Sequence, residues 1–150
     1  MKYSTFCLLL FILLLPAACD VESTDNGNLD GFWHLEQVDT LATGGSLNLK
    51  EQKIFWGVQY HLIHLTGAGQ ANNFYLRFRQ TGDSLYITQA FIEHSGTAGQ
   101  QGNGDEPLTN DSLLQIYGLQ SSNEQFIKVK LNGKWLILKS SRLQLTFRRF

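Results

Sequence analysis

Apolar and polar positions alternate along most of the chain after residue 30. The alternation is clearest in Asn73–Gln80, where Phe74, Leu76 and Phe78 share one face. Successive side chains of a β-strand point to opposite faces, so a period of two predicts half-buried strands. Similar patterns predict further strands, at Gly31–Thr40, Ser84–Glu93, Gln125–Leu131, Lys134–Ser140 and Arg142–Arg149.

The longest candidate strand is Lys53–Thr66. Its even-numbered residues from Ile54 to Leu62 are apolar and lie on one face of an extended chain. An amphipathic helix is the competing interpretation. Gly57 in the middle of the run, together with the β-branched and aromatic content, favours a strand.

The links between these strands are short or moderate. Asn132-Gly133 is a strong signal for a two-residue hairpin. Thr109 or Asn110 is placed to cap a short helix over Asp111–Tyr117, which Gly118 would end. The segments Leu41–Glu51 and Ser95–Glu106 are predicted to be loops.

These elements predict an all-β fold with about seven strands, or eight if the first is broken, and one short helix near residues 110–117. Sequential hairpins with few crossovers predict an antiparallel up-and-down meander. With this number of strands the meander is expected to close into a β-barrel, which leaves no unpaired edge.

The N-terminus carries a different pattern. The apolar run Phe6–Leu15 is about half the length of a transmembrane helix. It is followed by Pro16-Ala17-Ala18-Cys19, which resembles the lipobox of bacterial lipoproteins. We therefore expect residues 1–18 to be a signal peptide and Cys19 to be the acylated first residue of the mature protein. The alternative is an ordinary secretory signal cut after Ala18, with Cys19 left free.

Residues 19–29 are polar and acidic, and are expected to form a flexible tether ahead of a barrel domain over residues 30–150. The acidic residues also resemble the surface-export signal of lipoproteins in the Bacteroides group. With an acylated Cys19, the domain is expected in the cell envelope, on an outer membrane that it contacts through the lipid, and the acidic signal would place it at the cell surface. Because Cys7 leaves with the leader, one cysteine remains and no internal disulfide can form.

Composition and motifs exclude several functions. Without Lys2 the mature chain has a formal charge of −2, and no nucleic acid partner is expected. No serine-hydrolase elbow, zinc-protease motif or phosphate loop is present, so we expect neither an enzyme nor a cofactor. His61 and His64 would lie on opposite faces of a strand, and no metal site is expected. The strand residues His34, Glu36, Glu93 and His94 are expected at the surface or rim, with an inward Glu36–Glu93 pair as the lesser alternative.

The two ends of the predicted domain resemble the lipocalins and the wider calycin barrels. Gly31-Phe32-Trp33 matches their opening Gly-x-Trp, and Arg142–Phe150 is similar to the final strand of small lipocalin-like lipoproteins of the Bacteroides group. The resemblance implies that Trp33 closes the barrel floor beneath a basic residue of the last strand. The alternation of that strand selects Arg149, rather than Arg148, as this residue.

Six aromatic residues are candidates to line the barrel interior: Trp56, Tyr60, Phe74, Phe78, Tyr86 and Phe91. A filled core and a ligand pocket both remain open, since an eight-stranded barrel holds one small ligand at most. The leading hypothesis is a lipid-anchored barrel that binds a small apolar or amphipathic ligand at its mouth, near the late strands and the Ser95–Glu106 loop. The alternative is a filled barrel that docks another envelope protein.

Overall fold

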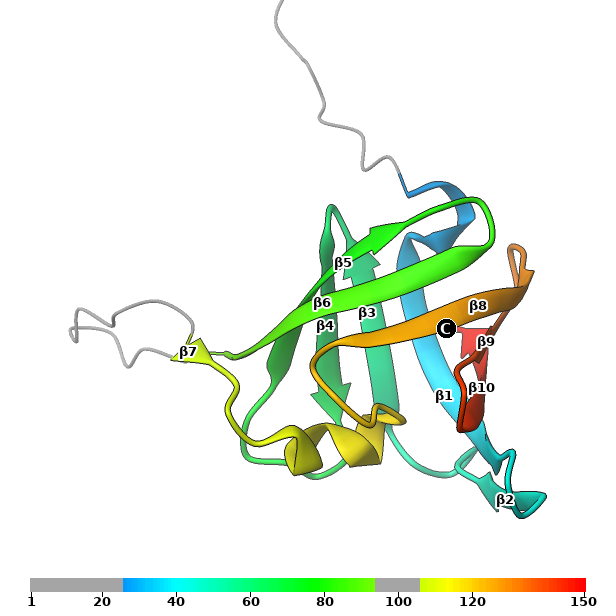
Figure 1. Ribbon diagram of the computed structural model, residues 1–150, viewed down its shortest axis with the longest axis horizontal. Coiled ribbons are helices and arrows are strands. Elements are labelled where there is room, and N and C mark those ends of the chain that lie inside the picture. Colours follow the sequence, from blue (N-terminus) through cyan, green and yellow to red (C-terminus); the bar gives the residue numbers. More distant parts are fainter. Residues whose placement is uncertain (1–25, 94–105) are drawn as a thin grey trace, which may run out of the picture.

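The computed structural model describes residues 26–93 and 106–150 (Figure 1). The fold is all-β, as predicted. Its strands are β1 (Gly31–Thr40), β2 (Gly45–Asn48), β3 (Ile54–Gln59), β4 (Leu62–Gly67), β5 (Phe74–Gln80), β6 (Ser84–Ile92), β7 (Glu106–Pro107), β8 (Glu124–Leu131), β9 (Trp135–Lys139) and β10 (Leu143–Arg149). Two short 3-10 helices, η1 (Gly27–Leu29) and η2 (Asp111–Tyr117), accompany them. The expected leader and Cys19 lie outside the described residues.

Eight antiparallel strands form a closed barrel. They are neighbours in the order β1, β3, β4, β5, β6, β8, β9 and β10, and β10 returns to pair with β1. In that last pairing Trp33 lies opposite Arg149 and Leu35 lies opposite Phe147. The predicted meander and its closure are therefore confirmed. Strand β2 pairs with the second half of β1, and β7 pairs with the end of β6, so both lie outside the ring.

The predicted single strand Lys53–Thr66 is wrong. The chain turns at Tyr60-His61, and β3 and β4 pair as a hairpin with Val58 opposite Ile63. The inward-facing residues accordingly change from even numbers in β3 to odd numbers in β4. Tyr60 makes the turn with a φ of +55°, a conformation that aromatic residues rarely adopt. Since no Gly, Asn or Pro marks this turn, the usual signal was missing.

The helix predicted near residues 110–117 is present as η2, although it is a 3-10 helix. The Asn110 side chain accepts a hydrogen bond from the Ser112 amide at 3.1 Å, which is the predicted cap. Gly118 ends the helix with a φ of +86°. A Cβ on Gly118 would lie 2.7 Å from a methyl group of Leu145, so close packing as well as the backbone requires glycine here.

Two predicted links differ in detail. Strand β2 occupies part of the segment Leu41–Glu51, which was expected to be a loop. The backbone N–H of Asn132 donates to the Trp135 carbonyl at 3.0 Å. The hairpin turn is therefore centred one residue later than Asn132-Gly133. Most of the predicted loop Ser95–Glu106 lies outside the described residues.

The last residues of the expected tether are packed against the barrel. Leu29 in η1 is completely buried, and Asn26 is buried as well. The Asn26 side chain donates to the carbonyl oxygen of Tyr60 and to a carboxylate oxygen of Asp30. The domain therefore begins no later than Asn26, four residues before the predicted boundary at residue 30.

Candidate functional site

The predicted pair of Trp33 and Arg149 is in contact. The Arg149 guanidinium carbon lies 4.7 Å from the centre of the Trp33 ring. Its Nη2 also donates to the backbone oxygens of Asn28 and Asp30, each at 2.8 Å. Gly31, with a φ of +141°, leaves room for this guanidinium, because a Cβ there would lie 2.9 Å from Nη1. These contacts close the end of the barrel at which η1 lies (Figure 1).

Three of the six candidate lining residues face the interior: Trp56, Phe74 and Phe78. Their environment is filled rather than hollow. The Trp56 ring centre lies 4.9 Å from that of Phe147 and 6.4 Å from that of Phe126. Close ring packing of this kind is how small barrels fill their interior with their own side chains.

Helix η2 lies at the other end of the barrel (Figure 1), and its Tyr117 is completely buried. Its ring packs edge-on against Phe74 at 5.9 Å, and its hydroxyl donates to the Gly67 carbonyl at 3.4 Å. Its own carbonyl accepts a hydrogen bond from the Trp56 indole at 3.1 Å. Burial raises the pKa of the Tyr117 phenol. Side chains of the described residues therefore occupy both ends of the barrel.

The other three candidates, Tyr60, Tyr86 and Phe91, are on the outside of the barrel. Tyr60 lies in the β3–β4 turn, and 48% of it is exposed. The guanidinium of Arg79 covers the Tyr86 ring at 3.9 Å, and that of Arg77 covers Phe91 at 5.3 Å. The prediction of an inward orientation is wrong for these three residues.

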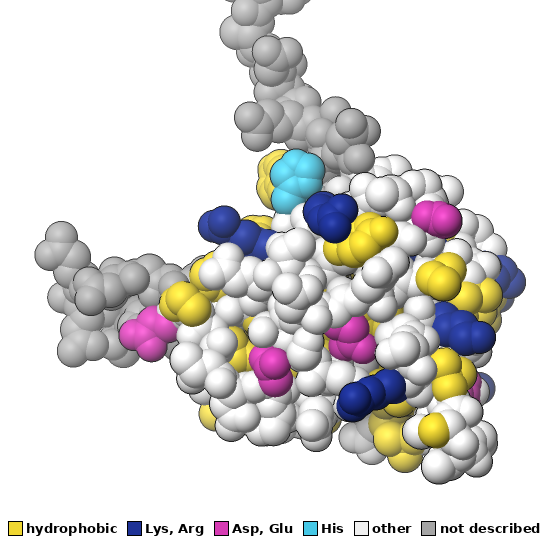
Figure 2. All heavy atoms as spheres, in the orientation of Figure 1, with side chains coloured by type: hydrophobic (Ala, Val, Ile, Leu, Met, Phe, Trp, Pro, Cys, Tyr) yellow, Lys and Arg dark blue, Asp and Glu magenta, His cyan; other side chains and the backbone are white. Residues whose placement is uncertain are grey.

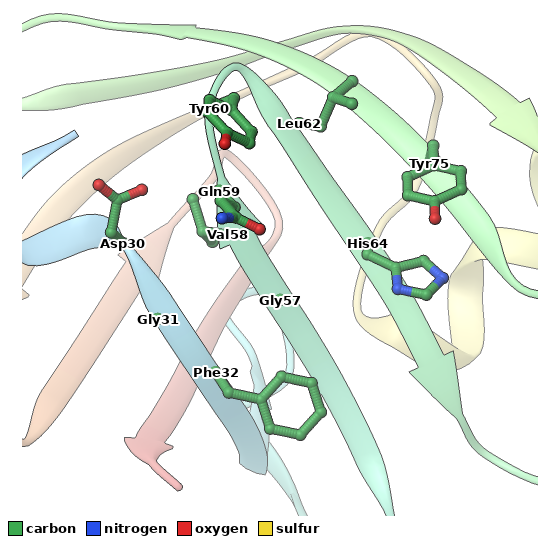
Figure 3. Close-up of a pocket in the computed structure, with 10 residues that line it drawn as sticks. All are labelled: Asp30, Gly31, Phe32, Gly57, Val58, Gln59, Tyr60, Leu62, His64 and Tyr75. Carbon is green, nitrogen blue, oxygen red and sulfur yellow. The ribbon is translucent and has the colours of Figure 1, made fainter. Parts of the chain in front are cut away.

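The structure has a groove of about 540 Å³ on the outer face of β1, β3, β4 and β5 (Figure 3). Strand pairing places four residues in one row across it, because Phe32 lies opposite Gly57, Gly57 opposite His64, and His64 opposite Tyr75. Gly57 lies between the side chains of Phe32 and His64 and forms the floor. The hollow therefore exists because one position in an otherwise aromatic row has no side chain.

The rim of the groove combines apolar and polar groups. Tyr60 and Leu62 are its exposed apolar residues, and Asp30 and Gln59 supply a carboxylate and an amide. Asn26 holds the rim by hydrogen bonding both Asp30 and the Tyr60 carbonyl. Such a surface suits an amphipathic molecule, whose apolar part would lie over Gly57 and whose polar part would reach the rim.

One wall of the groove is stiffened by a polar cluster. The His64 and Tyr75 rings are stacked with centres 4.4 Å apart. The Glu93 carboxylate accepts hydrogen bonds from the Asn73 amide at 2.7 Å and from the Tyr75 hydroxyl at 3.1 Å, and it lies 3.5 Å from His64 Nε2. The hydrogen bond from Asn73 is the main cause of the lowered pKa of Glu93. Glu93 was expected at the surface or rim, and its side chain is 28% exposed. Its carboxylate also contacts Tyr75 and His64, which both line the groove.

The expectation of surface or rim positions is wrong for His34 and Glu36, although both are on the outer side of β1. They are 7% and 5% exposed, respectively. His34 Nε2 lies 2.6 Å from the Gln52 carbonyl, and Arg148 Nε lies 2.5 Å from the Glu36 carboxylate. The segment that follows β2 covers them, which a strand pattern does not reveal. They stabilise the fold and do not line the groove.

The histidines that the structure describes do not form a shared site. His61 is in the β3–β4 turn, His64 lines the groove, and His94 lies outside the described residues. Residues 26–93 and 106–150 contain no group of three or more His, Cys, Asp or Glu side chains placed to hold a metal ion. Within the same ranges no helix has the length and apolar character needed to cross a membrane.

Comparisons with known proteins agree with the barrel architecture. The sequence model of the family described as a lipocalin-like domain matches residues 11–150. The crystal structure of a lipocalin-like protein from Bacteroides uniformis has a TM-score of 0.59 and 21% identity, covering 83% of this chain and 100% of that one. The structure of an uncharacterized protein from Bacteroides eggerthii has a TM-score of 0.55 and 19% identity, covering 81% of this chain and 98% of that one. No match was found among curated proteins.

Proposed function

Because the chain belongs to the lipocalin-like domain family, we propose that it is a lipid-anchored binding protein of the cell envelope whose ligand site is the outer groove. A lipocalin-like barrel supports a ligand-binding or structural role. Since one fold can carry many functions, the site itself must support the finer proposal. The observation that carries it is the groove over Gly57, on a barrel whose interior is packed.

The ligand class follows from the groove. Its volume of about 540 Å³ is in the range of small-molecule sites. Phe32, Tyr60 and Leu62 offer apolar surface, while Asp30 and Gln59 offer hydrogen bonds. The ligand is therefore a small apolar or amphipathic molecule, bound without chemical conversion. The proposed site is on the outer wall of the barrel, whereas the leading hypothesis from the sequence was a site at the mouth.

Anchoring is proposed on the sequence alone. Cys19 follows the leader and would carry the acyl chains that hold the protein at the outer membrane. Stable anchoring by lipid takes more than one chain, and bacterial lipoproteins, which the leader resembles, carry such a group. Mass spectrometry of the mature N-terminus is expected to find a diacylglycerol adduct on Cys19. A mature chain with an unmodified cysteine at its N-terminus would overturn this part of the proposal.

The ligand site is tested by filling it. Gly57→Val adds a side chain at the floor, where its Cβ would lie 3.3 Å from the Phe32 ring. Valine suits a strand, so the barrel is expected to remain folded. The wild type, purified from its own envelope, is expected to carry a small adduct in native mass spectrometry, and Gly57→Val is expected to lose it.

Gly82→Ala is the matched control, because a Cβ at Gly82 has no atom within 4 Å. It is expected to retain the adduct. A wild type that is consistently bare, or an adduct that survives in Gly57→Val, would count against the groove. Equal far-ultraviolet circular dichroism of the three proteins would show that loss of the adduct is not loss of the fold.

A second candidate function is a filled barrel that docks another envelope protein. The packed interior favours it, as do the exposed Leu113 and Ile116 on η2, at the end of the barrel away from η1. Crosslinking in intact cells distinguishes the two functions. A discrete protein adduct formed from a photoreactive residue at position 116, but not at position 60, would support docking instead of ligand binding.

A further inference from the structure

Four exposed apolar residues lie in or beside the groove: Phe32, Tyr60, Leu62 and Phe150. The first three line the groove together. The Phe150 ring packs edge-on against Phe32, with centres 6.1 Å apart, and is itself 78% exposed. We refer to these four residues as the groove-side patch. An exposed apolar surface of this kind marks an interaction site.

The patch lies beside the point where the chain enters the domain. Asn26, the first described residue, is hydrogen bonded to the backbone of Tyr60 and to Asp30, which both line the groove. In Figure 1, η1 and the turn between β3 and β4, which carries Tyr60, lie at the same end of the barrel, and Figure 2 shows the side chains in the same orientation. The N-terminal entry and the patch therefore belong to the same end of the barrel.

The covalent chain limits how far this end can be from the proposed lipid. Asn26 follows Cys19 by seven positions, so seven residue steps join them. Whatever their conformation, they span at most about 25 Å at roughly 3.6 Å per residue. An acylated Cys19 would hold Tyr60 and its neighbours close to the bilayer surface, whereas η2 lies at the opposite end of the barrel.

We propose that the groove-side patch docks on the lipid bilayer, so that the barrel lies against the membrane instead of hanging from it. This inference rests on the proposed acylation for its geometry and adds a second, non-covalent membrane contact. Tyr60 suits the role, since tyrosine places an apolar ring and a polar hydroxyl at the boundary between lipid and water. Aromatic and aliphatic side chains in this setting bind by burial in the interface.

The contact needs little intrinsic affinity. A short flexible linker gives the linked surface an effective concentration in the millimolar range. A patch whose affinity for lipid is about 1 mM would therefore be occupied about half of the time once the chain is anchored. For the same reason, the patch on its own is expected to bind vesicles only weakly.

Backbone geometry also points to a function for Tyr60. Its φ of +55° is unfavourable for an aromatic residue, whereas glycine or asparagine would fit the turn without strain. Strained residues cluster at binding sites, where the side chain is required in a particular position. The strain here holds a half-exposed ring at the rim of the patch.

The experiment measures the patch without the acyl chains. The mature chain with Cys19→Ser is mixed with vesicles of phosphatidylcholine, and with vesicles that also contain phosphatidylglycerol, and binding is followed by co-sedimentation. The double variant Tyr60→Asn and Phe150→Ser is expected to bind about tenfold more weakly to both. Asparagine tolerates the backbone of the turn, so the ring is removed without added strain.

Leu47→Ser is the matched control, because Leu47 is exposed on β2, far from η1 (Figure 1). It is expected to bind as the parent protein does, with little dependence on salt. The proposal is overturned if the parent protein does not bind vesicles, if the double variant binds equally well, or if binding requires phosphatidylglycerol. The Cys19→Ser protein carries no acyl chain, and the vesicle assay contains no groove ligand. A negative result here therefore leaves the separate tests of acylation and of ligand binding unaffected.

Discussion

Trp56 and Gly57 are neighbours in β3, and they show how differently the two faces of this barrel are used. Trp56 points inward, where it is fully buried against Phe126 and Phe147. Gly57 points outward and leaves a hollow between Phe32 and His64. Large side chains fill the interior, whereas the outer wall has a hollow where Gly57 has no side chain. The groove suited to ligand binding that the described residues form is on the outside of the barrel.

The largest effect is expected inside the barrel. Trp56→Ala removes a buried indole and its hydrogen bond to Tyr117, and should lower the free energy of unfolding by about 3–5 kcal/mol. Trp135→Ala, at a half-buried position in β9, serves as the control and should lose less than half as much. Urea unfolding measures both. Equal losses would mean that the interior is not the tightly packed region.

The next largest effect on stability is expected at the end of the barrel where η1 lies. Arg149→Met keeps the length of the side chain but removes the contact with the Trp33 ring and two hydrogen bonds to η1 and its flank. We expect a loss of about 2 kcal/mol in urea unfolding. Arg142→Met, at an exposed position ahead of β10, should change stability little. A neutral result for Arg149→Met would show that this end is closed by η1 alone.

A smaller effect of opposite sign is expected at the groove. Tyr60→Asn relieves the positive φ and should raise the free energy of unfolding by about 0.5–1 kcal/mol. Tyr60→Phe retains both the ring and the strain, so it should leave stability unchanged. Thermal unfolding compares the two variants. If Tyr60→Asn were destabilising, the ring would be contributing to the fold and not to a binding surface.

The smallest effect is pH dependence from Glu93. Its pKa is lowered in the folded state, chiefly by the hydrogen bond from Asn73, so its stabilisation is present above its ordinary pKa and lost as the pH falls through the folded value. The contribution should be below about 1 kcal/mol, because the carboxylate is partly exposed. In Glu93→Gln, the difference in stability from wild type should shrink below a pH of about 4. A difference that is constant with pH would contradict the assignment.

Local sequence patterns were sufficient for several elements. Asn110 and Gly118 bracket η2 as the capping rules predict, because caps depend on residues only a few positions apart. The alternation in β10 identified Arg149 as the partner of Trp33, because strand parity is strictly local. The β3–β4 hairpin was missed because Tyr60 occupies a backbone conformation that its side chain disfavours. The signal available was a change of parity: the inward-facing residues are even-numbered up to Val58 and odd-numbered from Ile63.

The groove could not be predicted in the same way. Phe32, Gly57, His64 and Tyr75 come from four strands, and only the pairing register places them in one row. Two of the four were visible as anomalies, since Gly57 interrupts an apolar run and His64 lies among aliphatic residues. An unusual residue in one strand does not show which side chains of the neighbouring strands lie beside it. His34 and Glu36 teach the same point, because a segment from elsewhere in the chain buries them.

The sequence by itself determined the apolar face of most strands, because alternation is a local property of extended chain and burial of apolar area drives folding. It also determined the capped helix and the family resemblance at the two ends of the domain. Tertiary structure decided that the interior is filled and that the hollow is outside. Closing eight strands sets the registers between them, and these registers bring Phe32, His64 and Tyr75 around the vacant position at Gly57.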